Sequence, residues 1–433
     1  MRGIGSLLVL GLTLTACASA PLPAPETGGG TLEVPAPVTP AADPLGALAA
    51  KAPAAEAAFL RDLSLLYAQD PRLRAGHLRG QAIEARAQSL ANPFRPDFSI
   101  IGSTIGEGNL TLRATQPLID FGKRNAEIAR LSATRGLTEQ ETAAARSALL
   151  AQALSAIEEA RHARARIALH RRQIAEYREA ERAAQDLVDL NLASATELRL
   201  AAVEGQRAQV DLSSAEADLT DARLSWYALM GATPVPNAVD AGVLRRVAGV
   251  DTTTAAQEAA LLHGAGIQKL RATRILQQAE VQSARLRRRP TISADAALAL
   301  DGSSDATGIG LTLDVPLHRR DLDDDLAEAR AQLPAIDAEI DSAGRDAKTA
   351  IARAASLAQS QRRLAAQQDK NVALLRMRIQ DVGFQVQNGL APYTDVIEAR
   401  VDMFEAELAA LESRAAARTA EAEILLLSGV LVP

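Results

Sequence analysis

Two carboxylates, Asp395 and Glu398, stand one helical turn apart behind a turn signal in the stretch "NGLAPYTDVIEAR", residues 388–400. A spacing of three residues places both side chains on one face of a helix. Such a pair can attract a cation, share a proton or stabilise the positive end of the helix dipole. Five histidines are scattered through the chain: His77, His162, His170, His263 and His318. No nucleophile motif or phosphate-binding glycine loop accompanies them, so the sequence predicts no enzyme, no metal site and no cofactor.

The chain contains one cysteine, Cys17, which directly follows an apolar segment of signal-peptide length. That segment starts behind Arg2, is too short to span a bilayer and ends in "LTAC", which resembles the bacterial lipobox. Residues 1–16 are therefore predicted to be a lipoprotein signal peptide, and Cys17 the site of diacylglycerol and palmitate attachment. By the same resemblance, Ala18 favours sorting to the outer membrane. The alternative is a free cysteine behind an ordinary cleaved signal.

Composition bounds the remaining possibilities. Of the 433 residues, 48% are hydrophobic and only 3% are aromatic, which predicts a core of small side chains between closely spaced helices. The net charge of -6 is spread along the chain and argues against a nucleic-acid partner. Residues 17–53 are rich in Pro, Ala and Gly and are predicted to form a lipidated tether.

Beyond the tether the same plan occurs twice, in residues 54–231 and 254–433, with an inter-repeat segment at 232–253. Each repeat starts with a helix, continues in a hairpin of short strands, enters a very long helix, turns, and returns in a shorter helix. The returning segments align without a gap when shifted by about 198 positions. Gly231 and Gly429 end them, as helix C-caps do.

The long helices set the size of the molecule. They are predicted at roughly 122–190 and 319–387, and each would be about 100 Å long. The returning helices cover about half of that length, so the leading segments 72–91 and 254–289 are expected to complete each column. Pro334 lies inside the second long helix, where it should kink the helix or break it.

Four strands are predicted, two at about 97–118 and two at about 291–316. Ile309, Leu311 and Leu313 alternate with smaller or polar residues, so one face of the hairpin is apolar. Four strands cannot close a barrel alone, which indicates that several copies of the chain share one transmembrane barrel. The alternative is a pair of hairpins packed on a soluble layer.

Three stretches carry a family resemblance: "ATQPLIDFGKRNAEIARLSA", "TLDVPLHRRDLDDDLAEARA" and "GLAPYTDVIEARVDMFEAELA". Together with the duplication they resemble the TolC family of outer-membrane factors, over nearly the whole chain after the tether. The resemblance implies a mainly α fold with a small transmembrane β-barrel. Three copies would form a twelve-stranded shared barrel and an α-barrel reaching through the periplasm, with 232–253 in an equatorial belt.

The resemblance also implies a function. The homotrimer would be a passive duct, lipid-anchored in the outer membrane, that docks a periplasmic adaptor and an inner-membrane transporter. Small-molecule efflux is the first expectation, and type I polypeptide secretion is the alternative. A periplasmic coiled-coil spacer without a pore remains a third possibility.

The two turns that end the long helices would form the periplasmic tip and contact the adaptor. The tip residues are Asn191, Leu192, Ala193, Glu197, Asn388, Gly389, Leu390 and Ala391. By resemblance, Asp395 and Glu398 would face the lumen as acidic rings; the alternative is that both acids only stabilise the helix N-terminus. In the best-known member an arginine of a neighbouring subunit pairs with the acid matching Glu197. Ala391 replaces that arginine here, so this latch does not carry over.

Overall fold

The computed structural model describes residues 44–92, 96–103, 109–190, 193–231, 233–237, 239–299, 308–316 and 320–432. The chain divides into two units, Met1–Pro40 and Ala41–Pro433, and every described residue belongs to the second. The predicted signal peptide, Cys17 and most of the tether therefore lie outside the described residues.

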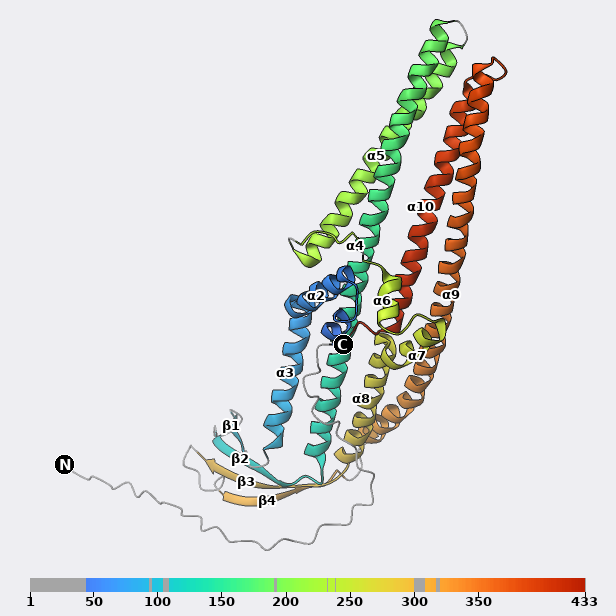
Figure 1. Ribbon diagram of the computed structural model, residues 1–433. Helices are drawn as coiled ribbons and strands as arrows, with labels where there is room; N and C mark the ends of the chain where they lie inside the picture. Colours follow the sequence, from blue (N-terminus) through green and yellow to red (C-terminus); the bar gives the residue numbers. More distant parts are fainter. Residues whose placement is uncertain are drawn as a thin grey trace, which may run out of the picture. The chain divides into compact units, whose positions relative to one another are not determined.

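The order of the elements repeats itself once along the chain (Figure 1). The first series is α1 (Pro44–Ala49), α2 (Ala54–Gln69), α3 (Pro71–Ala91), β1 (Asp97–Ser103), β2 (Asn109–Ile119), α4 (Lys123–Asp189) and α5 (Ala195–Met230). The connecting helix α6 (Ala241–Val247) follows. The second series is α7 (Thr253–His263), α8 (Ala265–Arg287), β3 (Thr291–Ala299), β4 (Gly308–Asp314), α9 (Arg320–Gln387) and α10 (Thr394–Ser428).

The four predicted strands form one antiparallel sheet in the order β1-β2-β3-β4. Its register places apolar side chains opposite each other: Ile100 pairs with Leu112, and Leu112 with Leu298. Side chains on this face are unprotected, since Ile309 is 89% exposed and Leu311 73% exposed. The sheet therefore has one uncovered apolar face and two edges, β1 and β4.

The long helices form the predicted columns. α4 has 67 residues, about 100 Å of helix, and packs with α3 over one part and with α5 over another. α9 packs in the same way with α8 and α10, and α4 joins the two halves through α8 and α10. Within the described ranges no helix is both long and apolar enough to cross a membrane.

Pro334 does not end the second long helix, so the predicted possibility of a break is wrong. α9 continues through it from Arg320 to Gln387. Proline has no N–H, and its ring displaces the preceding turn. Close to that turn, the buried Gln277 side chain of α8 donates a 3.0 Å hydrogen bond to the Ala329 carbonyl. This bond joins α8 to α9 about one turn before the proline.

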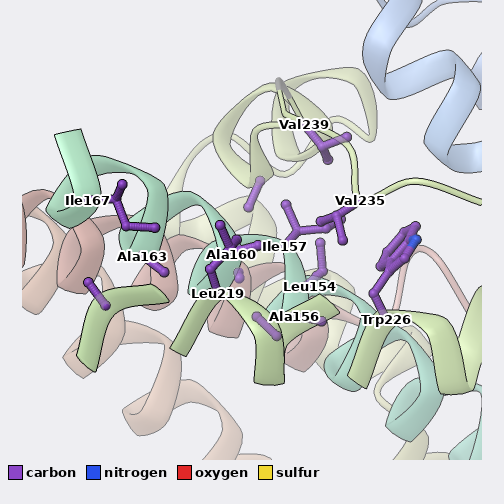
Figure 2. Close-up of a cluster of buried hydrophobic side chains, with 14 of the residues drawn as sticks. Leu154, Ala156, Ile157, Ala160, Ala163, Ile167, Leu219, Trp226, Val235 and Val239 are labelled. Atoms are coloured by element: carbon purple, nitrogen blue, oxygen red, sulfur yellow. The ribbon is translucent and has the colours of Figure 1, made fainter. Parts of the chain in front are cut away.

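Small side chains dominate the core where the inter-repeat segment meets the helices (Figure 2). Ala156 and Ala160 of α4 are 1% and 0% exposed, which allows neighbouring backbones to approach closely. Trp226 of α5 is fully buried beside them, and its indole Nε1 donates a 2.8 Å hydrogen bond to the Thr233 carbonyl. Val235 and Val239 complete this cluster, so the segment between the repeats is part of the core.

The end of α10 depends on a glycine. Gly429 has φ 70°, and a Cβ atom there would lie 2.2 Å from the His263 carbonyl oxygen. Gly429→Ala is expected to lower the free energy of unfolding by more than about 2 kcal/mol, because left-handed strain adds to the clash. Gly383→Ala is the control: it lies inside α9 with open space around it, so stability should stay or rise by up to about 1 kcal/mol. Equal thermal unfolding temperatures for the two variants would contradict this account.

Candidate functional site

The two turns that join the helical hairpins lie at the same end of the molecule (Figure 1). Asn191 and Leu192 of the first turn lie outside the described residues, while Ala193 leads into α5. In the second turn Gly389 has φ 69°, and the Leu390 N–H donates to the Gln385 carbonyl at 2.8 Å. This is how a glycine ends a helix through a left-handed residue.

Glu197 connects the two turns within one chain. Its Oε1 accepts a 3.1 Å hydrogen bond from the Tyr393 N–H, at the start of α10. Its Oε2 accepts a 2.6 Å hydrogen bond from the Ser194 N–H, as the acid of a capping box does. The residue is only 8% exposed, so both bonds are shielded from water. A buried carboxylate thus satisfies backbone donors of two helices 196 positions apart.

Asp395 and Glu398 lie where the sequence placed them, in the first turns of α10. Asp395 is half-buried and Glu398 is exposed. Within the described part of the chain, neither carboxylate has a hydrogen bond or ion pair, and no group of three metal-ligating side chains forms. The two charges are therefore free to act on a solute or on another copy of the chain.

The two hairpins are also joined along α4 and α10, a feature that sequence reasoning missed. Glu407 of α10 pairs with Arg172 of α4 and, at 2.7 Å, with Arg376 of α9. Arg400 donates a 2.7 Å hydrogen bond to the Glu176 carbonyl, across the same contact. Burial raises the pKa of the Glu176 carboxyl above its ordinary value. The two hairpins of one chain are consequently held together over much of their length.

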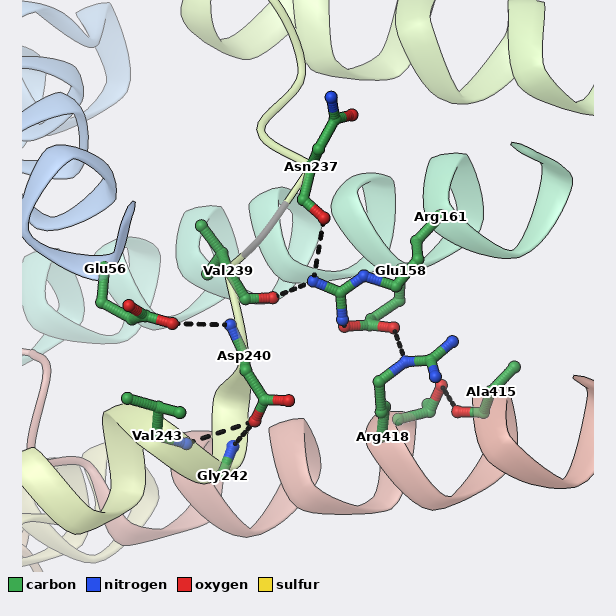
Figure 3. A network of polar contacts seen from close by, with 11 residues as sticks. Glu56, Glu158, Arg161, Asn237, Val239, Asp240, Gly242, Val243, Ala415 and Arg418 are labelled. Atoms are coloured by element: carbon green, nitrogen blue, oxygen red, sulfur yellow. Dashed lines mark hydrogen bonds and ion pairs between the residues drawn. The ribbon is translucent and has the colours of Figure 1, made fainter. Parts of the chain in front are cut away.

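A buried ion network anchors the inter-repeat segment (Figure 3). Glu158 of α4 is 8% exposed and accepts hydrogen bonds from Arg161 at 2.8 Å and Arg418 at 2.6 Å. Arg161 also donates to the backbone carbonyl of Val239. One carboxylate therefore ties α4, α10 and the segment between the repeats together. A buried pair of this kind is costly to break from one side, since a charge would be left unpaired.

A cavity of about 530 Å³ lies beside this network, between α6, α9 and α10. Its wall includes Asp240, whose Oδ1 accepts the Gly242 N–H at 2.7 Å, and Arg245, which donates to the Val250 carbonyl at 3.1 Å. Burial, followed by the nearby Arg362, lowers the pKa of Arg245. Most of the charged groups lining the cavity are thus already engaged by the protein itself.

The sheet is polar on the face opposite its apolar one. The Thr115 hydroxyl donates a 2.6 Å hydrogen bond to Asp295 on the neighbouring strand. At the end of the sheet next to the helices, the Lys123 ammonium donates to the Thr291 hydroxyl at 2.7 Å. The two faces therefore suit different surroundings, one water and the other an apolar phase.

The role of Glu197 is open to a direct test. Glu197→Ala leaves the Ser194 and Tyr393 N–H groups without an acceptor, so amide exchange at Tyr393 is expected to accelerate by about tenfold or more. Hydrogen exchange read by mass spectrometry over residues 390–397 measures this. Glu181→Ala, at an exposed position of α4, serves as the control and should change nothing there. Unchanged exchange at Tyr393 in the Glu197 variant would refute the connection between the turns.

No family model matches the chain, and no curated protein matches its sequence. Solved structures do match its fold. The channel protein CusC has a TM-score of 0.71 at 17% identity, covering 85% of this chain and 91% of that one. The outer-membrane protein VceC of Vibrio cholerae has a TM-score of 0.69 at 18% identity, and the match covers 86% of this chain and 96% of that one. The open state of the MtrE outer-membrane channel of Neisseria gonorrhoeae has a TM-score of 0.67 at 16% identity, and the match covers 85% of this chain and 88% of that one. The expected mainly α fold with a small β-sheet is confirmed, and the chain has the fold of the TolC family of outer-membrane channels.

Proposed function

We propose that this chain forms the outer-membrane exit duct of a tripartite efflux system. The observation that carries the proposal is the sheet, with its uncovered apolar face and two open edges, joined to helices about 100 Å long. An apolar sheet face suits a bilayer, and long helices suit a conduit that leads away from it. The fold shared with outer-membrane channels supports the same conclusion.

The duct is a homotrimer in this proposal. Four strands from each of three copies give a barrel of twelve, in which β1 of one copy pairs with β4 of the next and no edge remains. The helices offer matching surfaces: Val203 and Val210 of α5 are each 60% exposed, seven residues apart. Leu357 and Leu364 of α9 repeat that spacing and are 46% and 40% exposed. Apolar positions seven residues apart form a seam against another helix.

The organisation of the chain follows from this assembly. The signal peptide (1–16) is removed, Cys17 carries the lipid anchor, and a tether leads to repeats 54–231 and 254–433. The end of the segment predicted as tether, 17–53, is folded, since α1 (Pro44–Ala49) packs on α2 and Leu45 is buried. The sheet lies in the outer membrane and the helices extend into the periplasm. Segment 232–253 belongs to the outside of the cylinder, as its contacts with α4 and α10 support.

The tip contacts the partners. An adaptor protein of the periplasm docks on the residues of the two turns, from Asn191 to Glu197 and from Asn388 to Ala391. An inner-membrane transporter supplies the energy, and small molecules pass through without entering the periplasm. The duct itself performs no catalysis.

Asp395 and Glu398 act at the tip as rings of three carboxylates each. Like charges held close to one axis repel by about 1 to 4 kcal/mol per pair, depending on the effective dielectric constant. The rings therefore favour cations over anions at the constriction. Stabilisation of the helix dipole, about 0.3 to 1 kcal/mol, adds to this role without replacing it.

Conductance in planar bilayers tests the duct and its rings together. The purified full chain should form cation-selective channels that multivalent cations block. Asp395→Ala with Glu398→Ala is expected to reduce both the selectivity and the block, because it removes the charge at the constriction. The matched control is Glu412→Ala with Glu423→Ala, which removes two charges from α10 further from the turn. Absence of any channel would refute the duct, whereas unchanged selectivity in the tip variant would refute only the rings.

The lipid anchor has its own test. Cells fed labelled palmitate should label the wild-type chain, and Cys17→Ser should abolish the label because no other cysteine is present. The Cys17→Ser protein should still conduct in bilayers after purification, since the sheet rather than the lipid forms the pore. Label retained on the Cys17→Ser chain would contradict the assignment.

A further inference from the structure

The half of the molecule next to the sheet has two free flanks. Its helices contact one another in the order α3, α4, α8, α9 (Figure 1). The strands follow the same order, because β1 follows α3 and β4 precedes α9. One flank therefore consists of α3 with β1, and the other consists of the N-terminal half of α9 with β4.

The outward face of α3 is basic. Leu73 is buried and Gly76 lies against Thr142 of α4, and helical periodicity places another set of side chains on the opposite side. That set, here called the basic face, consists of the exposed residues Arg74, Leu78, Arg79, Ala82, Ala85, Arg86 and Ser89. Among the described residues, neither the Arg74 guanidinium nor the Arg79 guanidinium has a hydrogen bond or an ion pair. Glu84 is the single acid of α3 and is engaged with Arg135 of α4 at 2.9 Å.

The outward face of the N-terminal half of α9 is acidic. Leu326 and Ile336 are buried on the inner side. The opposite side, here called the acidic face, holds Asp324, Ala331, Ala335, Ala338, Glu339, Ser342 and Asp346, with Glu328 at its edge towards α8. Three other acids of this half are already engaged by α8, for example Asp337 with Arg274 at 2.5 Å. Asp324 and Glu339 have no such partner among the residues described.

The charged residues of the two faces lie at similar distances from the sheet, and both faces carry small side chains. Counted from the ends of the helices at the sheet, Arg79 lies about 18 Å along α3 and Glu328 about 12 Å along α9. Arg74 and Glu339 lie about 26 and 28 Å along, so each pair falls within about one helical turn. Next to the charges both faces carry Ala and Ser, which let two helices approach closely, and the basic face also carries the exposed Leu78. Charge, height and small side chains thus fit one face to the other.

We propose that the basic face of one copy binds the acidic face of the next, and that this pairing fixes the head-to-tail order of the ring. The occupant of each face is a second copy of this chain, because each face continues into an open sheet edge that only another strand can complete. The pairing rests on the proposed trimer and deepens it. Like charges would meet if two copies joined flank to identical flank, so the wrong arrangement is disfavoured.

Charge exchange between the faces tests the pairing. One variant carries Arg74→Glu and Arg79→Glu, a second carries Glu328→Arg and Glu339→Arg, and a third carries all four substitutions. The trimer fraction of the full chain in detergent is measured by native mass spectrometry at low salt. Each double variant is expected to lower the association constant by at least about tenfold, and the fourfold variant to restore it to within about threefold. The loss should shrink near 1 M salt, where screening acts over about 3 Å.

The matched control is Arg178→Glu with Arg182→Glu, an equal charge change at exposed positions of α4 away from both flanks, which should leave assembly unchanged. Restoration by the fourfold variant also shows that the double variants fold. A wild-type chain that stays monomeric would overturn the trimer and the pairing together. A stable wild-type trimer whose double variants assemble normally, or whose fourfold variant fails to recover, would overturn the pairing alone.

Discussion

A sheet that one chain cannot complete is the constraint on which the rest of the structure depends. Each of its outer strands has an unpaired row of backbone groups, and its apolar side chains, such as Ile309 and Leu313, lie uncovered. Unpaired edges are a liability in water and are not tolerated in lipid, so both edges require partners. In the proposed trimer, strands from identical copies would pair with both edges. The duplicated chain supports that solution, because both of its hairpins enter the same sheet and long helices leave from the same end.

Polar contacts hold the helices of one chain together as a single layer. Glu197 holds the two turns together at one end, Glu407 joins α4, α9 and α10 further along, and Glu158 ties in the segment between the repeats. Each of these carboxylates is shielded from water, so removing one partner would leave a buried charge behind. Within a chain the polar contacts are therefore largely complete. The incomplete surfaces are its flanks, where copies would meet.

Small side chains let the helices of this layer pack closely. Ala156 and Ala160 let neighbouring helices approach closely around Trp226, the single tryptophan of the chain. An interior of this kind contributes less apolar burial per residue than one rich in leucine and aromatic side chains. Ion pairs between helices add to the stability of such a core, and in the proposed trimer the contacts between copies would add further burial.

Local patterns determined much of this protein. Alternation along residues 309–313 set the apolar strand face, apolar periodicity set the long helices, and Gly389 marked the turn before Asp395. These features depend on neighbours a few positions away, so the sequence could predict them. The possible break at Pro334 was wrong, since α9 continues through the proline from Arg320 to Gln387.

Only the tertiary structure decided which distant residues meet. Glu197 bonds to Tyr393 across 196 positions and Glu158 to Arg418 across 260, and no local pattern encodes either contact. The same holds for the free flanks. Charged residues such as the basic ones on α3 and the acidic ones on α9 are common on helices. Only the packing of the helices shows which of them lie on an uncovered face. The sequence by itself determined the helices and strands, because they depend on short-range periodicity. The tertiary structure decided which helix faces and strand edges stay uncovered, because this depends on the order in which the elements pack.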